Sequence, residues 1–133
     1  MGNIERNIEL KPVVKTSQII AARKIVDQIH ISHNIQQYIV SLVCATREPE
    51  KYGLKDLRSL ITYGASPRAT IFISTAAKSH AFINKRAFVI PEDIRSVGKS
   101  ILRHRIILSY EAEAEEITTD YIIQRIYESV QTP

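Results

Sequence analysis

Gly64-Ala65-Ser66-Pro67-Arg68-Ala69 carries the clearest local signal in the chain, the start of a helix. Ser66 is a favoured N-cap residue, because its hydroxyl accepts a hydrogen bond from free backbone N–H groups two or three residues later. Pro67 suits the first helical position, where no N–H is needed and φ is already close to the helical value. The stretch therefore predicts a helix from Pro67 to about Phe82, with Arg68 in its first turn.

Arg68 is an unexpected residue for a first turn, because a positive charge there opposes the helix dipole by about 0.3–1 kcal/mol. A phosphate group at the same place would reverse that sign, since the guanidinium and the free N–H groups would both attract it. Spacing alone leaves two interpretations open. Arg68 either contacts an anion or is a solvated surface residue.

The composition is that of one compact domain. The chain has 133 residues, enough to bury a core. It contains no apolar run of roughly 18 residues, the length needed to span a membrane, and residues 1–6 lack the apolar segment of a signal peptide. Cys44, the single cysteine, cannot form an internal disulfide and is expected to be a buried free thiol. These features favour a cytoplasmic protein.

Charge is unevenly distributed, although the net charge is only +4. The segment from Arg68 to Arg105 holds eight Lys or Arg residues and two acidic ones, whereas Glu111–Glu116 holds four glutamates. Such a pattern is typical of a protein that binds an anion or pairs opposite faces with a neighbour. Ordinary solvated helix faces would give the same pattern.

Hydrophobic spacing predicts further helices joined by short turns. Residues 1–15 show no period and are expected to be a loosely ordered lead-in to a helical domain at 16–133. The expected helices run from Ser17 to about Gln28, from Ser32 to about Arg47, from Pro67 to about Phe82, onward from Pro91, and from Thr118 to about Val130. Because strand signals are few, we expect an all-α bundle with at most one very short β-ribbon.

The spacing also predicts which face of each helix is buried. The expected inner residues of the first helix are Ile19, Ile20, Ala22, Ile25, Val26 and Ile29. Those of the helix at Pro67 are Ile71, Thr75, Ala76 and Ser79, with Phe72, Ile73 and Phe82 on the flanks. Small residues on the helix that begins at Pro67 would let a neighbouring helix approach closely.

Two patterns that suggest a catalytic or metal site fail on inspection. Gly98-Lys99-Ser100 matches the end of a phosphate-binding loop, but the full motif requires glycine where Asp93 stands. His30 and His33 lie three residues apart, yet zinc would need two further ligands, and no Cys, Asp or Glu is placed to supply them. Nothing in the residues supports catalysis by this chain alone.

Two binding functions remain open from the residues. Arg95, Lys99 and Arg103 recur every four residues and form a basic row that nucleic-acid phosphates would attract. The central segment has few exposed aromatics for base stacking, and no known nucleic-acid motif is present, which weighs against that function. The other open function is a stand-alone helical module that binds a protein.

Several motifs, in order along the chain, resemble the MoxR family of AAA+ ATPases. They are Tyr38–Val43 with Thr46-Arg47, Gly64–Ala69, Ala76-Ala77-Lys78, Val89–Ile94, Leu102–Leu108 and Glu111-Ala112-Glu113. The resemblance covers roughly Val14 to Val130 and concerns the helical lid that follows the nucleotide-binding core in that family. The core's phosphate-binding loop, Walker B acids, sensor 1 residue and arginine finger have no counterparts in this chain.

The resemblance implies a role for Arg68 as the sensor 2 arginine, which reaches toward the γ-phosphate of ATP, with Ser66 and Pro67 forming the helix start that positions it. It implies ATP and Mg²⁺ as cofactors of the full-length protein. It also implies contacts with the AAA+ core and with neighbouring subunits of a hexameric ring, and chaperone-like work on von Willebrand factor A domain proteins. The chain alone is expected to be inactive and to bind ATP weakly, and whether Arg68 acts in cis or in trans stays open.

Two departures from the family pattern carry structural expectations. The family usually has Thr before Pro-Glu-Asp, where this chain has Ile90, so that helix is expected to lose a side-chain cap worth about 1 kcal/mol. The family often has Gly-Arg after the central helix, where this chain has Lys85-Arg86. Asn84 is therefore expected to take the left-handed conformation that ends the helix.

Overall fold

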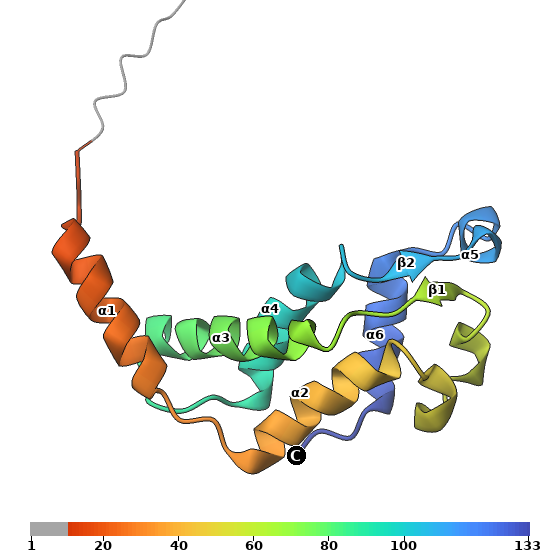
Figure 1. Ribbon diagram of the computed structural model, residues 1–133, viewed down its shortest axis with the longest axis horizontal. Helices are drawn as coiled ribbons and strands as arrows, with labels where there is room; N and C mark the ends of the chain where they lie inside the picture. Colours follow the sequence, from red (N-terminus) through yellow and green to blue (C-terminus); the bar gives the residue numbers. More distant parts are fainter. Residues whose placement is uncertain (1–10) are drawn as a thin grey trace, which may run out of the picture.

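The computed structural model of the protein describes residues 11–133, which form a helical bundle with one two-stranded ribbon (Figure 1). The helices are α1 (Thr16–Gln28), α2 (His33–Ala45), α3 (Arg68–Ile83), α4 (Pro91–Leu102), α5 (Tyr110–Ala114) and α6 (Thr119–Ser129), with short 3-10 turns at Pro49–Tyr52 and Lys55–Leu57. Strands β1 (Ile61–Tyr63) and β2 (Ile107–Leu108) pair antiparallel. The predicted all-α class with one very short ribbon is confirmed. Most of the expected lead-in at 1–15 lies outside the described residues.

The N-caps of two helices form as predicted. The Ser32 hydroxyl accepts a hydrogen bond from the Ile35 N–H (3.3 Å), and the Thr118 hydroxyl accepts one from the Tyr121 N–H (3.2 Å). Each bond satisfies one of the backbone donors that a helix start leaves free. The first helix begins at Thr16 rather than after Ser17.

The centre of the bundle is the contact between α3 and α4. Four fully buried residues spaced by four line the inner face of α3: Ala69, Ile73, Ala77 and Ala81. The face predicted for this helix is therefore wrong, since Ile71 is 63% exposed. The alanines face inward because their small side chains let α4 approach closely, and this close packing outweighs the larger apolar area of Ile71.

Helix α1 also departs from the prediction. Three of its expected inner residues, Ile19, Ile20 and Ile25, are about half exposed, and the helix buries no residue completely. Figure 1 shows α1 at one end of the molecule, extending away from the bundle, and its main packing is against α3. The sequence of α1 is amphipathic, but within the described residues its apolar face is only partly covered.

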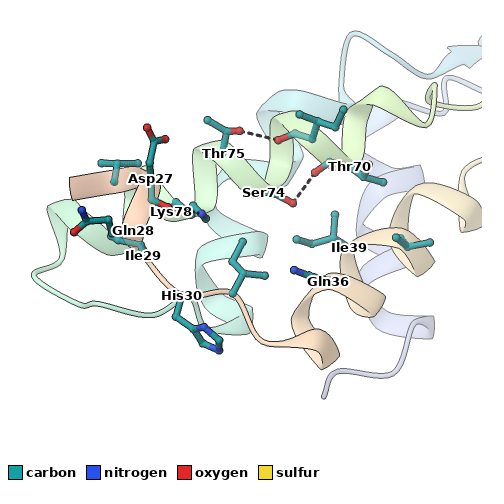
Figure 2. A pocket seen from close by; sticks show the side chains of 14 residues that line it. Asp27, Gln28, Ile29, His30, Gln36, Ile39, Thr70, Ser74, Thr75 and Lys78 are labelled. Atoms are coloured by element: carbon teal, nitrogen blue, oxygen red, sulfur yellow. Dashed lines mark hydrogen bonds between the residues drawn. The ribbon is translucent and has the colours of Figure 1, made fainter. Parts of the chain in front are cut away.

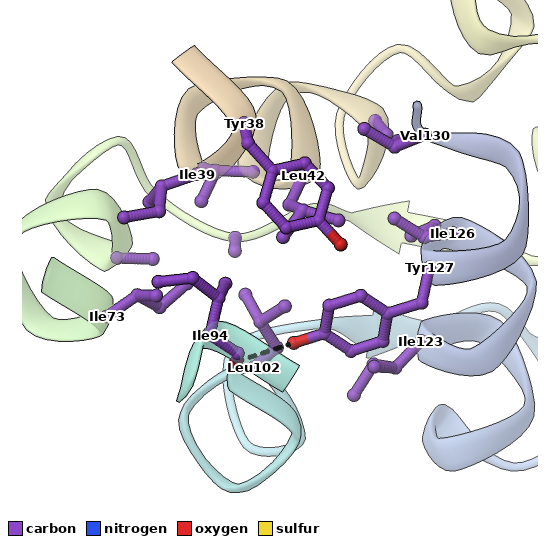
Figure 3. Close-up of a cluster of buried hydrophobic side chains, with 14 of the residues drawn as sticks. Tyr38, Ile39, Leu42, Ile73, Ile94, Leu102, Ile123, Ile126, Tyr127 and Val130 are labelled. Atoms are coloured by element: carbon purple, nitrogen blue, oxygen red, sulfur yellow. Dashed lines mark hydrogen bonds between the residues drawn. The ribbon is translucent and has the colours of Figure 1, made fainter. Parts of the chain in front are cut away.

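Tyr127 of α6 packs against α4 and explains why Gly98 is a glycine. Its hydroxyl donates a hydrogen bond to the Ile94 carbonyl (3.2 Å), as Figure 3 shows, and burial raises the pKa of Tyr127. A Cβ atom on Gly98 would lie 2.1 Å from the Tyr127 hydroxyl oxygen. Gly98 therefore makes room for Tyr127, which agrees with rejecting a phosphate-binding loop at this position.

The turn between α3 and α4 is held by a buried carboxylate. Asp93, with no exposed surface, accepts two hydrogen bonds from Arg86 (2.6 and 2.7 Å) and one from the Ile90 N–H (2.9 Å), and His80 Nδ1 lies 2.6 Å away. The side-chain cap that Ile90 was expected to lose is absent from α4, as predicted, and Asp93 instead accepts from the N–H of Ile90 itself. This network joins the end of α3 to the start of α4.

Lys85, rather than Asn84, adopts the left-handed conformation after α3. The expectation for Asn84 is wrong because its side-chain amide donates to the His80 carbonyl (2.8 Å), which keeps Asn84 next to the helix end. The Arg86 N–H then donates to the Ala81 carbonyl (2.9 Å), the bond that closes a Schellman motif. This turn of the chain places the Arg86 side chain within hydrogen-bonding distance of Asp93.

We predict a pH-dependent stability from Asp93. Burial raises the pKa of Asp93, but the hydrogen bonds from Arg86, the Ile90 N–H and His80 outweigh it and lower the pKa from 3.8 to about 2. Since the folded pKa is the lower one, the stabilisation is present above pH 3.8 and is lost as pH falls through 2. The unfolding free energy should fall by about 2 kcal/mol between pH 5 and pH 2 on this account.

Urea denaturation of the chain and of Asp93→Asn across this pH range measures the effect. At pH 7 the variant should be less stable by about 2–3 kcal/mol, because it leaves Arg86 without its ion pair. It should also lack the part of the acid-induced loss that Asp93 contributes. Parallel pH profiles for the two proteins would contradict the assignment.

Candidate functional site

The loop before α3 is fixed to the end of α2. The Ala65 N–H donates to the Thr46 hydroxyl oxygen (2.9 Å), and the Thr46 hydroxyl donates in turn to the Val43 carbonyl (2.7 Å). Ala65 and Thr46 have no exposed surface. A Cβ atom on Gly64 would lie 2.2 Å from the Thr46 carbonyl oxygen, so only glycine fits there. The loop thus enters α3 from a defined position.

Ser66 and Pro67 form the start of α3 itself. The Ser66 hydroxyl accepts from the Arg68 N–H (3.3 Å), and the Ser66 carbonyl accepts from the Ala69 N–H (2.8 Å). Pro67 has helical dihedral angles (φ −52°, ψ −27°), although the regular helix begins one residue later, at Arg68. The expected boundary at Pro67 is therefore displaced by one residue, within the ordinary scatter of helix ends.

Arg68 is exposed, and its neighbour Ala69 is fully buried. Because Ala69 fixes how the helix is rotated, the Arg68 side chain has to leave the bundle on its outer side. Its guanidinium forms no hydrogen bond or ion pair with any residue from 11 to 133. The site therefore presents a free cation at the positive end of the α3 dipole, an arrangement that attracts an anion, although the Arg68, Ala69 and Thr70 N–H groups are already hydrogen-bonded within the turn.

The basic row predicted on α4 is largely occupied. Asp120 pairs with Arg103 (2.7 Å) and with Lys99 (3.2 Å), and the hydrogen bond from Arg103 lowers the pKa of Asp120. Arg95 donates to the Thr132 hydroxyl (3.0 Å). These contacts reduce the positive charge that nucleic-acid phosphates would meet, so the row is a weaker anion site than Arg68.

Two further arginines lie near the Arg68 loop, and sequence reasoning did not single them out. Arg47 Nη1 lies 3.4 Å from the Ala65 carbonyl oxygen, at the edge of hydrogen-bonding distance. The Arg105 guanidinium lies over the ring of Phe72, 4.9 Å from its centroid. Both lie in motifs that carry the sequence's resemblance to the MoxR family, but only the tertiary structure places Arg47 beside Ala65 and Arg105 over Phe72.

A groove of about 630 Å³ lies between the end of α1, α2 and α3 (Figure 2). Lys78 crosses its rim and donates to the Asp27 carbonyl (2.9 Å). The hydroxyls of Ser74 and Thr75 donate to carbonyls of their own helix, as the dashed lines in Figure 2 show, so they are already satisfied. The groove contains no arrangement of acid, base and nucleophile.

The other predicted features have simpler roles. His30 pairs through its backbone, its N–H with the Ala87 carbonyl and its carbonyl with the Val89 N–H, both at 2.9 Å. Within residues 11–133 no three His, Cys, Asp or Glu side chains are grouped to hold a metal ion. Cys44 is a free thiol that is partly exposed, not buried as expected, because it lies at the margin of the inner face of α2. Among the described helices, none is long and apolar enough to cross a membrane.

Comparison with known proteins identifies the class to which this fold and loop belong. The AAA lid domain family matches residues 56–126, so the chain belongs to the AAA lid domain family. Over 125 residues it is 37% identical to Chaperone MoxR1 of Mycobacterium tuberculosis, covering 94% of this chain and 33% of that protein. Over 105 residues it is 33% identical to Protein MoxR of Methylorubrum extorquens, covering 74% of this chain and 30% of that protein.

A solved structure gives the same result. A crystal structure from Cytophaga hutchinsonii, provisionally described as that of an ATPase, superposes with a TM-score of 0.86 at 46% identity and covers 88% of this chain and 36% of that one. The resemblance to MoxR lids is confirmed. The chain spans about a third of the length of these relatives and of the solved chain.

We predict that Thr46 holds the loop in place. Thr46→Val removes the acceptor of the Ala65 N–H while keeping the side-chain shape, so the buried donor is left unpaired at a cost of about 1–3 kcal/mol. Urea denaturation measures the change, and amide exchange at Ala65 should become faster than in the unaltered chain. Thr75→Val, at an exposed position on α3, is the control. Equal stability of the two variants would show that the Thr46 bond does not hold the loop.

Proposed function

We propose that this chain is the lid of a MoxR-type AAA+ ATPase and that Arg68 is its sensor 2 arginine, in contact with the γ-phosphate of ATP. The observation that carries the proposal is the free Arg68 guanidinium in the first turn of a helix whose start is tied to α2. Membership of the AAA lid domain family supports it, since a lid closes over a nucleotide.

The geometry suits a lid that moves as one body. Arg68 belongs to the helix that Thr46 ties to α2 through Ala65, and Asp93 joins the other end of that helix to α4 through His80. A phosphate contact at Arg68 would therefore pull on α2, α3 and α4 together. This coupling is how nucleotide state would reach a neighbouring subunit of the ring.

The residues of the described chain fit part of a nucleotide site. Arg68, at the positive end of the α3 dipole, would hold terminal phosphate oxygens, whereas no grouped carboxylates in the described part of the chain suit Mg²⁺. When bound, ATP supplies the phosphoryl group and Mg²⁺ neutralises its charge. We propose that the phosphate-binding loop and the metal ligands lie on a core joined to this lid.

The proposal extends to partners and boundaries. The lid domain would occupy residues 16–133, with 1–15 leading in from the core. Its contacts would be the core, neighbouring ring subunits and proteins with von Willebrand factor A domains, and its place would be the cytoplasm. The half-exposed apolar residues of α1 support a contact with another protein surface.

We predict that Arg68→Ala in the full-length ATPase lowers kcat at least about tenfold, because one donor to the developing phosphate charge is lost. Steady-state ATP hydrolysis measures this. Arg58→Ala, which removes another exposed arginine, is the matched control and should leave turnover unchanged. Normal turnover of the Arg68 variant, with its fold intact, would remove Arg68 from the site.

A second prediction concerns the chain by itself. The 133-residue chain should not bind ATP with micromolar affinity, because the arginines of the lid alone supply too few contacts to offset the entropy lost on binding. Isothermal titration calorimetry tests this. A micromolar dissociation constant would mean that the chain holds a nucleotide site of its own.

A stand-alone protein-binding module is the alternative, and the exposed face of α1 favours it equally. The two functions differ in what the gene encodes before Met1. A Walker A sequence there would decide for the lid. A defined protein partner, with no ATPase core encoded in the same chain, would decide for the module.

A further inference from the structure

A second arginine, from a different part of the chain, lies over Phe72 in the second turn of α3. Arg105 follows the end of α4, and its Nη1 donates to the Ile101 carbonyl (2.8 Å). Its guanidinium lies over the Phe72 ring, 4.9 Å from the centroid, and also contacts the His104 ring. A cation within about 6 Å of a ring centroid is attracted by the π-electrons. Arg105 is therefore partly immobilised.

Phe72 brings Arg105 to the turn that carries Arg68. The two α3 residues are four apart, so their side chains lie on the same face of the helix. Long helical side chains lean toward the N-terminus of their helix and cover the preceding turn. The Phe72 ring therefore lies toward Arg68, and the guanidinium over that ring lies near the first turn.

Neither arginine has a carboxylate partner among residues 11–133. Other arginines of the bundle show the alternative, since Arg86, Arg103 and Arg125 each pair with an aspartate at 2.6–2.9 Å. Two neighbouring cations without counter-charge repel each other. A bound polyanion would remove that repulsion and form charge-assisted bonds with both.

We propose that Arg105 is a second phosphate-contacting residue of the lid and that Phe72 is its positioning residue. The ligand is the polyphosphate chain of a nucleoside triphosphate: Arg68 contacts its terminal phosphate, and Arg105 contacts an adjoining one. This inference rests on the proposed function of Arg68. It adds that the lid contributes to nucleotide affinity through a residue outside the helix-start motif.

Steady-state hydrolysis by the full-length ATPase tests the inference. Arg105→Gln should raise KM for ATP about 10- to 100-fold, the usual effect of losing one charge-assisted bond. Arg105→Lys keeps the charge and should restore part of the affinity. Arg103→Gln is the matched control, because it removes an arginine two residues earlier that is paired with Asp120, and its KM should be unchanged.

Phe72→Leu tests whether the ring positions Arg105, because it should change KM without unfolding the protein. Leucine keeps an apolar side chain of similar size but offers no ring, so KM should rise by less than in Arg105→Gln while kcat and the melting temperature stay near normal. If Arg105→Gln fails to fold, Phe72→Leu and Arg105→Lys carry the test. A normal KM in the folded variants overturns the inference.

The result separates this inference from the proposed function. Loss of turnover in Arg68→Ala together with a normal KM in the Arg105 and Phe72 variants means that only the second contact is wrong. Normal turnover in Arg68→Ala means that the proposed function has failed, and the inference with it.

Discussion

The close approach of α3 and α4 is the constraint on which the rest of the structure depends. The inner face of α3 consists mainly of the fully buried alanines Ala69, Ala77 and Ala81, whose small side chains let a neighbouring helix approach closely. Their alignment fixes the rotation of α3, which places Arg68 and Phe72 on the outer side. The same contact positions α4, and Arg105 lies just after the end of that helix. Two cationic side chains thus owe their positions to a buried row that carries no charge.

Helix order and several ends could be predicted, because they depend on local chemistry. Ser32 and Thr118 cap the helices that follow them, and their bonds reach only three residues along the chain. The rotation of α3 could not be predicted in the same way. Ile71 contributes more apolar area than any alanine, so hydrophobic spacing favours the wrong face, and packing against the neighbouring helices reverses the preference.

The residues of the candidate site also differ in how far they could be predicted from local sequence. The Arg68 helix start was visible in the sequence, since serine, proline and arginine stand next to one another. Thr46 and Arg105 were not, because their roles come from residues 19 and 33 positions away along the chain, Ala65 and Phe72 respectively. The burial of Asp93 could not be predicted either, because it depends on Arg86 arriving through the left-handed turn at Lys85.

Gly98 and Tyr127 have a consequence for how such a lid can vary. The Tyr127 hydroxyl occupies the space where a side chain at position 98 would begin. The two positions therefore share a single volume, and neither can enlarge unless the other shrinks. Among related lids, substitutions at these positions should be accepted in compensating pairs, so that covariation between them would report the packing of α6 on α4.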